Sequence, residues 1–132
     1  MDLKFSEADI AFRQDVVDFL NSEYPEDIKE KQDKRIPLEK EEIVRWQKIL
    51  NEKGWFTINW PVEYSGQEEL TVTQKYILQE ELAKANTPTT IPFGMGMCAP
   101  VIYTFGTDEQ KKKFLPSIQS SDVWWCQGYS EP

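Results

Sequence analysis

The stretch GTDEQKKKFLPSIQSSDVWWCQGYSEP, residues 106–132, combines a helix start with the most strand-like sequence of the chain. Thr107 and Gln110 are spaced as a capping box, which predicts a helix that begins directly after Thr107. The lysines that follow lie toward the end of this helix, where positive charge favours the helix dipole, and Pro116 is expected to stop it. The run DVWWCQGY, residues 122–129, is typical of a strand because of its aromatic and branched residues.

Upstream of this stretch the sequence indicates helices. Ser6 and Asp9 form an acidic variant of the capping box, and the helix that they begin should end near Tyr24, which precedes a proline. A second helix is expected from Pro37, which suits a first helical turn, to Gly54, which suits the left-handed end of a helix. Both segments carry apolar residues at helical spacing, so each should bury one face.

Three segments connect or follow these helices. Residues 25–36, PEDIKEKQDKRI, are mostly charged and predict a solvated connection, with a partial helix as the alternative. Residues 54–66, GWFTINWPVEYSG, predict an ordered and packed loop because of their aromatic residues. Thr71 and Gln74 form another capping box and predict a third helix. Its expected apolar stripe comprises Val72, Tyr76, Leu78 or Gln79, and Leu82.

The segment IPFGMGMCAPVIYTFG, residues 91–106, is almost wholly apolar and is therefore expected to be buried on all sides. Gly94 and Gly96 permit the close approach of another backbone or of a ligand. Pro100 either kinks a single helix or begins a second short one.

These elements predict an all-α fold, a bundle of five to six helices with one C-terminal strand. An isolated strand is not stable, so the strands that pair with residues 122–129 are expected outside this chain or in a partner molecule. The expected core contains Phe12, Val16, Phe19, Trp46, Leu50 and Leu82.

Composition excludes several classes of function. The net charge of −8 argues against a nucleic-acid binder, which needs a basic face. The chain has no histidine, which excludes histidine-dependent triads and histidine-ligated zinc. Its two cysteines form no C-x-x-C motif, so we expect neither a metal site nor a disulfide framework. The sequence shows no secretory signal and no apolar run that could span a membrane, so a cytoplasmic protein is expected.

Several motifs together resemble the acyl-CoA dehydrogenase family. They are GTDEQKKKFLP (106–116), the segment WCQGYSEP (125–132), GWFTINWPVEYSG (54–66) and EEL (80–82), and their order and spacing match the family from Phe5 to Pro132. Ser65-Gly66 stands where the family commonly has paired glycines, and the family continues past the Ser/Thr-Glu-Pro motif. The resemblance implies that residues 1–121 are the N-terminal helical domain and that residues 122–132 begin the first strand of a middle β-domain.

The resemblance also implies a flavoprotein function. The family uses FAD to convert an acyl-CoA thioester into the trans-2-enoyl-CoA, and an electron-transfer flavoprotein or a similar acceptor takes up the electrons. It implies a homo-oligomer, or a hetero-oligomer with a related subunit. The catalytic glutamate and most cofactor contacts are expected beyond residue 132, so no catalytic residue is assigned and this piece should be inactive alone. The segment WCQGYSEP resembles members that act on bulky or unusual acyl groups.

The resemblance assigns candidate site residues to two segments. Ser130 would hydrogen-bond the flavin ring and border the substrate, with Gln127 and Tyr129 at neighbouring flavin positions; otherwise Ser130 is a turn residue. Phe93, Gly94 and Met97 would line one wall of the acyl pocket, since glycines beside methionines suit an adaptable apolar pocket; otherwise they pack the core.

Other residues have simpler explanations. Glu80 and Glu81 are adjacent on a helix and should point in different directions, so they do not form a two-carboxylate site. Cys126 is expected to be an inert, buried thiol. Residues 111–113 are lysines that could meet the phosphates of coenzyme A but are better explained as solvated. An alternative to the enzyme fragment is a self-contained helical binding or assembly module.

Overall fold

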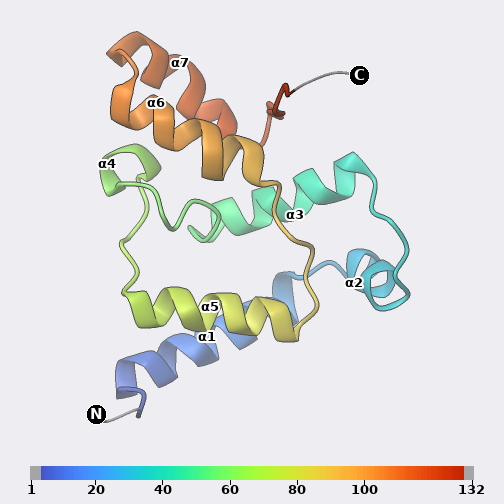
Figure 1. Ribbon diagram of the computed structural model, residues 1–132. Coiled ribbons are helices and arrows are strands. Elements are labelled where there is room, and N and C mark those ends of the chain that lie inside the picture. The colour runs from blue at the N-terminus through green and yellow to red at the C-terminus, as the bar shows by residue number, and fades with distance from the viewer. Residues whose placement is uncertain (1–3, 130–132) are drawn as a thin grey trace. The chain divides into compact units, whose positions relative to one another are not determined.

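The computed structural model describes residues 4–129, and this part of the chain is helical throughout, with seven α-helices, one π-helix and no strand (Figure 1). The predicted all-α class is confirmed, although the bundle has more helices than expected. The helices are α1 (Glu7–Glu23), α2 (Glu26–Asp33), α3 (Lys40–Glu52), α4 (Val62–Ser65), α5 (Val72–Lys84), the π-helix η1 (Phe93–Cys98), α6 (Ala99–Phe105) and α7 (Asp108–Gln119).

The helices divide into two compact units, and the division falls within α3. Unit 1 comprises Met1–Trp46 and Glu69–Pro88, and unit 2 comprises Gln47–Glu68 and Thr89–Pro132. Each unit is therefore made of two separate parts of the chain.

Unit 1 contains two of the predicted capping boxes. In α1 the Ser6 hydroxyl accepts from the Asp9 N–H and the Asp9 carboxylate accepts from the Ser6 N–H, and the helix ends before Tyr24 as expected. In α5, Thr71 and Gln74 make the same reciprocal pair. The two helices then pack side by side (Figure 1).

Residues 25–36, expected to form a solvated connection, contain the regular helix α2. Ile28 in this helix is fully buried, although the segment around it is charged. Ion pairs tie α2 to α3, because Lys31 Nζ lies 2.6 Å from Glu42 Oε1 and Arg45 bonds Asp27. The partial helix left open by the sequence is the correct alternative. Helix α3 begins at Lys40, three residues after the predicted Pro37.

The predicted core is partly right. Val16, Phe19, Trp46 and Leu50 are buried in their respective units. Phe12 and Leu82 are only half-buried. The predicted stripe of α5 is wrong at Val72 and Tyr76, which are exposed; its buried residues are Ile77, Leu78 and Glu81.

In unit 2 the loop after α3 is ordered, as predicted. Gly54 ends the helix with a φ of 85°, a left-handed conformation that favours glycine. Trp55, Phe56 and Trp60 are then buried, and the short helix α4 follows. The Trp60 Nε1–H donates to the Met95 carbonyl at 2.8 Å, which fixes this loop to η1.

The apolar segment 91–106 forms η1 and α6 in succession, with Pro100 in the first turn of α6. The prediction that it is buried on all sides is wrong. Met97, Val101 and Phe105 are 45%, 59% and 82% exposed. Residues four apart lie on one side of a helix, so the segment buries one face and leaves this apolar face outward.

Helix α7 begins with the predicted capping box of Thr107 and Gln110. Pro116 does not stop it, because the helix continues to Gln119. A proline removes only its own N–H bond, and its carbonyl still accepts from the Ser120 N–H at 2.9 Å.

The strand predicted for residues 122–129 is not formed in this structure. A strand requires a partner ladder, and the described part of the chain contains no second strand. Trp124 and Trp125 are half-buried and line a small cavity of unit 2 instead. Cys126 is exposed, so its expected burial is wrong.

Candidate cofactor and substrate site

The predicted site residues of unit 2 lie on two segments that contact each other, η1 and residues 123–129. Gly94 of η1 is buried beneath the Trp125 ring. A methyl group added at Gly94 would lie 3.1 Å from Trp125 Cδ1 and 3.2 Å from Ile118 Cγ2. Contacts this close leave no free space for a side chain at position 94, so the Trp125 ring packs directly on the backbone of η1.

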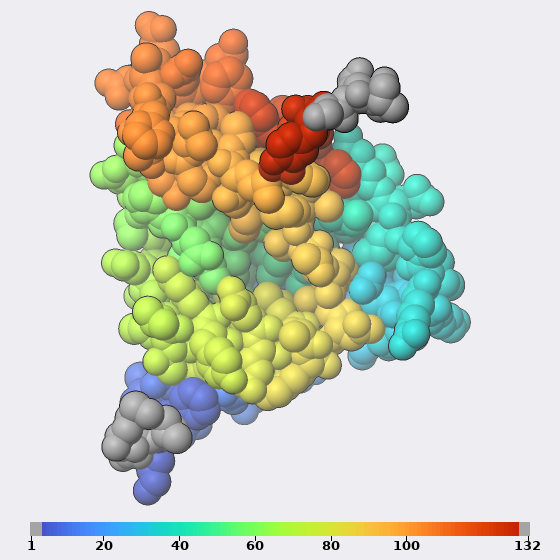
Figure 2. Space-filling model, viewed as in Figure 1, coloured from blue at the N-terminus to red at the C-terminus, as the bar shows by residue number. Residues whose placement is uncertain are grey.

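A second contact joins a predicted cofactor residue to a predicted substrate residue. The Gln127 side-chain amide Nε2 donates to Met97 Sδ at 3.2 Å. In Figure 2 the end of the described C-terminal segment (red) lies against the orange surface that η1 and α6 form. Tyr129 is 79% exposed and Phe93 is half-buried. Ser130 lies outside the described residues, so its predicted role remains a prediction.

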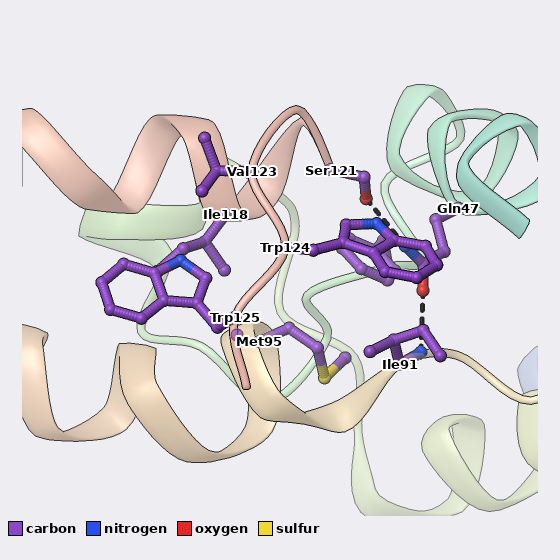
Figure 3. Close-up of a pocket in the computed structure, with 10 residues that line it drawn as sticks. Gln47, Ile91, Met95, Ile118, Ser121, Val123, Trp124 and Trp125 are labelled. Carbon is purple, nitrogen blue, oxygen red and sulfur yellow. Dashed lines mark hydrogen bonds between the residues drawn. The ribbon is translucent and has the colours of Figure 1, made fainter. Parts of the chain in front are cut away.

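A buried amide that the sequence did not reveal connects the segments around this contact. Gln47 of α3 is 2% exposed. Its Nε2 donates to Ser121 Oγ at 3.1 Å, and its Oε1 accepts from the Ile91 N–H at 2.7 Å (Figure 3). Gln47 therefore holds the end of α7 and the entry to η1 together. Its only sequence signal was its position next to Trp46, beside the apolar stripe of α3.

The cavity between these segments is small. Its lining includes Gln47, Gly94 and the two tryptophans of the C-terminal segment, and its volume is about 20 Å³. That volume suits about one water molecule and excludes an acyl chain.

A larger cavity of about 300 Å³ lies between α4 and α7, and two of the predicted lysines line it. Lys111 Nζ lies 3.1 Å from the Tyr64 hydroxyl and 5.3 Å from the centre of the Tyr64 ring. Lys113 covers the Phe114 ring at 5.2 Å. Lys112 and Lys113 are exposed, as expected for solvated residues, whereas Lys111 is half-buried against Tyr64.

The adjacent carboxylates of α5 in unit 1 do not diverge as the sequence predicted. Arg13 Nη1 lies 2.6 Å from Glu80 Oε2 and also bonds Glu81, which is buried. The hydrogen bond from Arg13 lowers the pKa of Glu80. Two carboxylates held by one guanidinium form an ion-pair network between α1 and α5, which is a structural arrangement.

The remaining titratable group near η1 is the Cys98 thiol. Burial raises the pKa of the Cys98 thiol, the direction expected for a thiol in apolar surroundings. Among residues 4–129 no group of three or more potential metal ligands gathers. No helix in that range is both long and apolar enough to cross a membrane.

Comparison with known proteins identifies the fold. The family model for the acyl-CoA dehydrogenase N-terminal domain matches residues 6–122. The chain belongs to the acyl-CoA dehydrogenase family. The resemblance found in the sequence motifs is thereby confirmed.

Relatives within this family include actinobacterial proteins. The chain is 41% identical over 93 residues to acyl-CoA dehydrogenase IpdE1 of Mycolicibacterium smegmatis, which covers 70% of this chain and 24% of that protein. It is 42% identical over 84 residues to acyl-CoA dehydrogenase FadE26 of Mycobacterium tuberculosis, which covers 63% of this chain and 20% of the relative. The chain thus spans about a quarter or less of the length of these relatives.

Two solved structures of the family superpose on the whole chain. The ChsE4–ChsE5 complex from Mycobacterium tuberculosis matches with a TM-score of 0.74 and 27% identity over 32% of its own chain. The Tcur3481–Tcur3483 steroid acyl-CoA dehydrogenase matches with a TM-score of 0.73 and 31% identity over 34% of its own chain. The helical arrangement of this chain is therefore that of the family.

Proposed function

We propose that this chain is the N-terminal helical part of an FAD-dependent acyl-CoA dehydrogenase that introduces a trans-2 double bond into an acyl-CoA thioester. In this proposal residues 1–121 are the helical domain, and residues 122–132 begin the first strand of the middle β-domain. The observation that carries the proposal is the contact of Gln127 with Met97. This contact joins a residue expected to border the flavin to one expected to border the acyl group.

The residues present fit the polar edge of a flavin. The Gln127 amide and the Tyr129 hydroxyl belong to exposed residues, so both side chains can reach a ligand. Gln127, Tyr129 and Ser130 would hold the ring edge and fix the flavin against the substrate. When bound, the flavin would accept the hydride that leaves the β-carbon of the acyl group.

On the substrate side we assign Phe93, Gly94 and Met97 to one wall of the acyl pocket, with Ser130 at its border. Support comes from the exposure of Met97 on η1 and from the adaptable thioether side chain. An apolar wall excludes water from the reacting carbons. The base that removes the α-proton lies outside this chain in the proposal, so residues 1–132 alone are inactive.

The substrate class that we propose is a bulky, ring-bearing acyl-CoA. The similarity to a structure described as a steroid acyl-CoA dehydrogenase supports this choice. The exposed apolar face of Met97, Val101 and Phe105 offers more surface than a short acyl chain requires. We also propose that the complete enzyme is a hetero-oligomer with a related subunit, supported by the similarity to the ChsE4–ChsE5 complex. An electron-transfer flavoprotein or similar acceptor would reoxidise it.

The test is a chimera in which this chain replaces the matched N-terminal segment of Mycolicibacterium smegmatis IpdE1. The chimera should retain FAD through gel filtration, and a steroid-ring acyl-CoA should bleach its flavin absorbance more than octanoyl-CoA does. Gln127→Ala should weaken FAD retention, whereas Gln79→Ala, an exposed glutamine of α5, should not.

Two results would contradict the proposal. One is a folded chimera that retains no FAD. The other is dehydrogenation of an acyl-CoA by the isolated 132-residue chain, which would show that the catalytic base lies within it.

A further inference from the structure

The Trp125 ring packs directly on a glycine, Gly94 of η1. The packing site that Gly94, Ile118 and Phe114 form around the ring is called the Trp125 seat below, with Gly94 as its floor. Gly94 is buried in η1, and the space that its side chain would fill is taken by Trp125 Cδ1 and Ile118 Cγ2. Gly96, two residues further along η1, is different, because a methyl group there would meet only Pro92 Cβ at an ordinary 3.9 Å. Of these two glycines of η1, only Gly94 lies against the Trp125 ring.

Other contacts make this seat rigid around Trp125. The Phe114 ring meets the Trp125 ring edge to face, with centroids 5.7 Å apart and an interplanar angle of 81°, an arrangement that aromatic pairs prefer. The backbone of η1 is also held in place beside Gly94, since the Trp60 Nε1–H donates a hydrogen bond to the carbonyl of Met95, the next residue. Figure 3 shows Trp125 beside Ile118 in this arrangement.

The seat sets the position of the residues that follow Trp125. Gln127 follows Trp125 by only two residues, and two residues span about 7 Å at most, so fixing Trp125 restricts where Gln127 can lie. Gly94 and Met97 both belong to the π-helix η1, and each contacts one residue of the C-terminal segment. The observed contacts of Gly94 with Trp125 and Gln127 with Met97 fit this restriction.

We propose that Gly94 is a positioning residue that acts through Trp125. Because Gly94 has no side chain, the Trp125 indole can pack against η1 at this point. The packed indole fixes the position of the residues that follow it, so that the Gln127 amide reaches Met97. In this role Gly94 supports the flavin edge through the Trp125 indole, in addition to its proposed place in the wall of the acyl pocket. The part that concerns the flavin rests on the proposed function, whereas the contact between Gln127 and Met97 does not.

The experiment uses the 132-residue chain without flavin, so that its failure and a failure of the proposed function are distinguishable. Nuclear Overhauser contacts between the Gln127 side-chain amide and the Met97 methyl group are measured in isotope-labelled protein. The unsubstituted chain and Gly96→Ala should show them. Gly94→Ala should lose them, and its Trp125 indole N–H should exchange about tenfold faster with solvent deuterium, because the ring is displaced from its seat.

Trp125→Leu provides a second variant in case Gly94→Ala fails to fold. It removes the ring from the seat and should also lose the Gln127–Met97 contact, and the double variant with Gly94→Ala should lose no more than Trp125→Leu alone, because both act through one contact. Thermal unfolding of each variant separates this local loss from a general loss of structure. The proposal is overturned if the contact survives Gly94→Ala or Trp125→Leu, or if Gly96→Ala abolishes it as well.

Discussion

Inside each of the two units, a different kind of interaction joins the helices. In unit 1, charged side chains bridge separate helices. Arg13 of α1 binds Glu80 and Glu81 of α5, and Lys31 of α2 binds Glu42 of α3. A buried tyrosine adds a polar contact, since the Tyr24 hydroxyl donates to the Asn86 carbonyl at 3.2 Å, and burial together with the charge of Asp33 raises the pKa of Tyr24 to about 12.

In unit 2 neutral groups make the hydrogen bonds described above around the candidate site, and Lys48 also pairs with Asp122 at 2.7 Å. Gln47 joins Ser121 to Ile91, and Trp60 bonds the Met95 carbonyl. The Gln119 amide likewise donates to the Ser65 carbonyl at 2.6 Å. Neutral amides and indoles do not titrate near neutral pH, whereas ion pairs weaken as a carboxylate is protonated. The hydrogen bonds of Gln47 and Trp60 should therefore persist at pH values that loosen the ion pairs of unit 1, whereas the Lys48–Asp122 pair of unit 2 should weaken in acid.

The largest expected effect tests the neutral framework of unit 2. Trp60→Ala should lower the free energy of unfolding by about 3–5 kcal/mol, because it removes a large buried side chain and leaves a cavity. The Trp60 ring also packs on Tyr103, with centroids 6.1 Å apart. Urea unfolding followed by circular dichroism measures the loss.

Phenylalanine substitutions separate the hydrogen bond from the packing. Trp60→Phe should lower the free energy of unfolding by about 1 kcal/mol beyond the loss that the smaller side chain causes, because the hydrogen bond to the Met95 carbonyl is also lost. Trp46→Phe in unit 1 is the matched control, since Trp46 Nε1 is buried without a hydrogen-bond partner in the described part of the chain. Equal losses in both variants would show that the Trp60 bond contributes nothing.

An intermediate effect is expected at Gln47. Gln47→Leu leaves the Ile91 N–H and the Ser121 hydroxyl without their partner and should cost about 2 kcal/mol, within the usual range for unsatisfied buried groups. This loss should be the same at pH 7 and at pH 4, because no charge is involved. Gln79→Leu, at an exposed position, is the control. A loss that changes with pH would break the contrast between the units.

The smallest effect concerns the ion pairs of unit 1. Arg13→Gln should destabilise the chain less than Gln47→Leu does, since Lys84 still pairs with Glu81 at 2.9 Å. Lys34→Gln is the control, because Lys34 and Glu30 form an exposed pair and such pairs contribute little. Unfolding measured between pH 3 and pH 7 separates the two variants.

The pH dependence of Arg13→Gln has a defined sign. Arg13 lowers the pKa of Glu80 from its ordinary 4.5, so the stabilisation is fully present above that pH and is lost as the pH falls toward the lower folded value. The difference between the unsubstituted chain and Arg13→Gln should therefore be largest at pH 7 and shrink below about pH 4.5. A difference that grows in acid would contradict this assignment.

The parts of the fold that could be predicted from the sequence depend on residues close together. Each capping box involves two residues three apart, so Ser6, Thr71 and Thr107 mark helix starts correctly. The burial of charged segments could not be predicted in this way. Glu81 is buried because Arg13, 68 residues away, neutralises it, and no local pattern contains that information.

The candidate site shows the same limit. The family motifs drew attention to η1 and to the C-terminal segment, but the contacts that join them, Gly94 with Trp125 and Gln47 with Ile91, link residues far apart in sequence. The predicted strand at residues 122–129 failed because strand propensity takes effect only when a second strand is present. The roles of Ser130, Gln127 and Phe93 remain predictions.

Helix α7 contains a proline, Pro116, which cannot donate a backbone hydrogen bond. Other bonds nevertheless hold the end of α7, including Ser120 N–H to the Pro116 carbonyl and Gln119 Nε2 to the Ser65 carbonyl. Ile118, one wall of the Trp125 seat, belongs to the last turn of α7. The Trp125 indole therefore lies between two anchored segments, η1 held by Trp60 and the end of α7 held by Gln47 and Gln119, so a neighbour that packs on the C-terminal segment meets an indole already held from both sides.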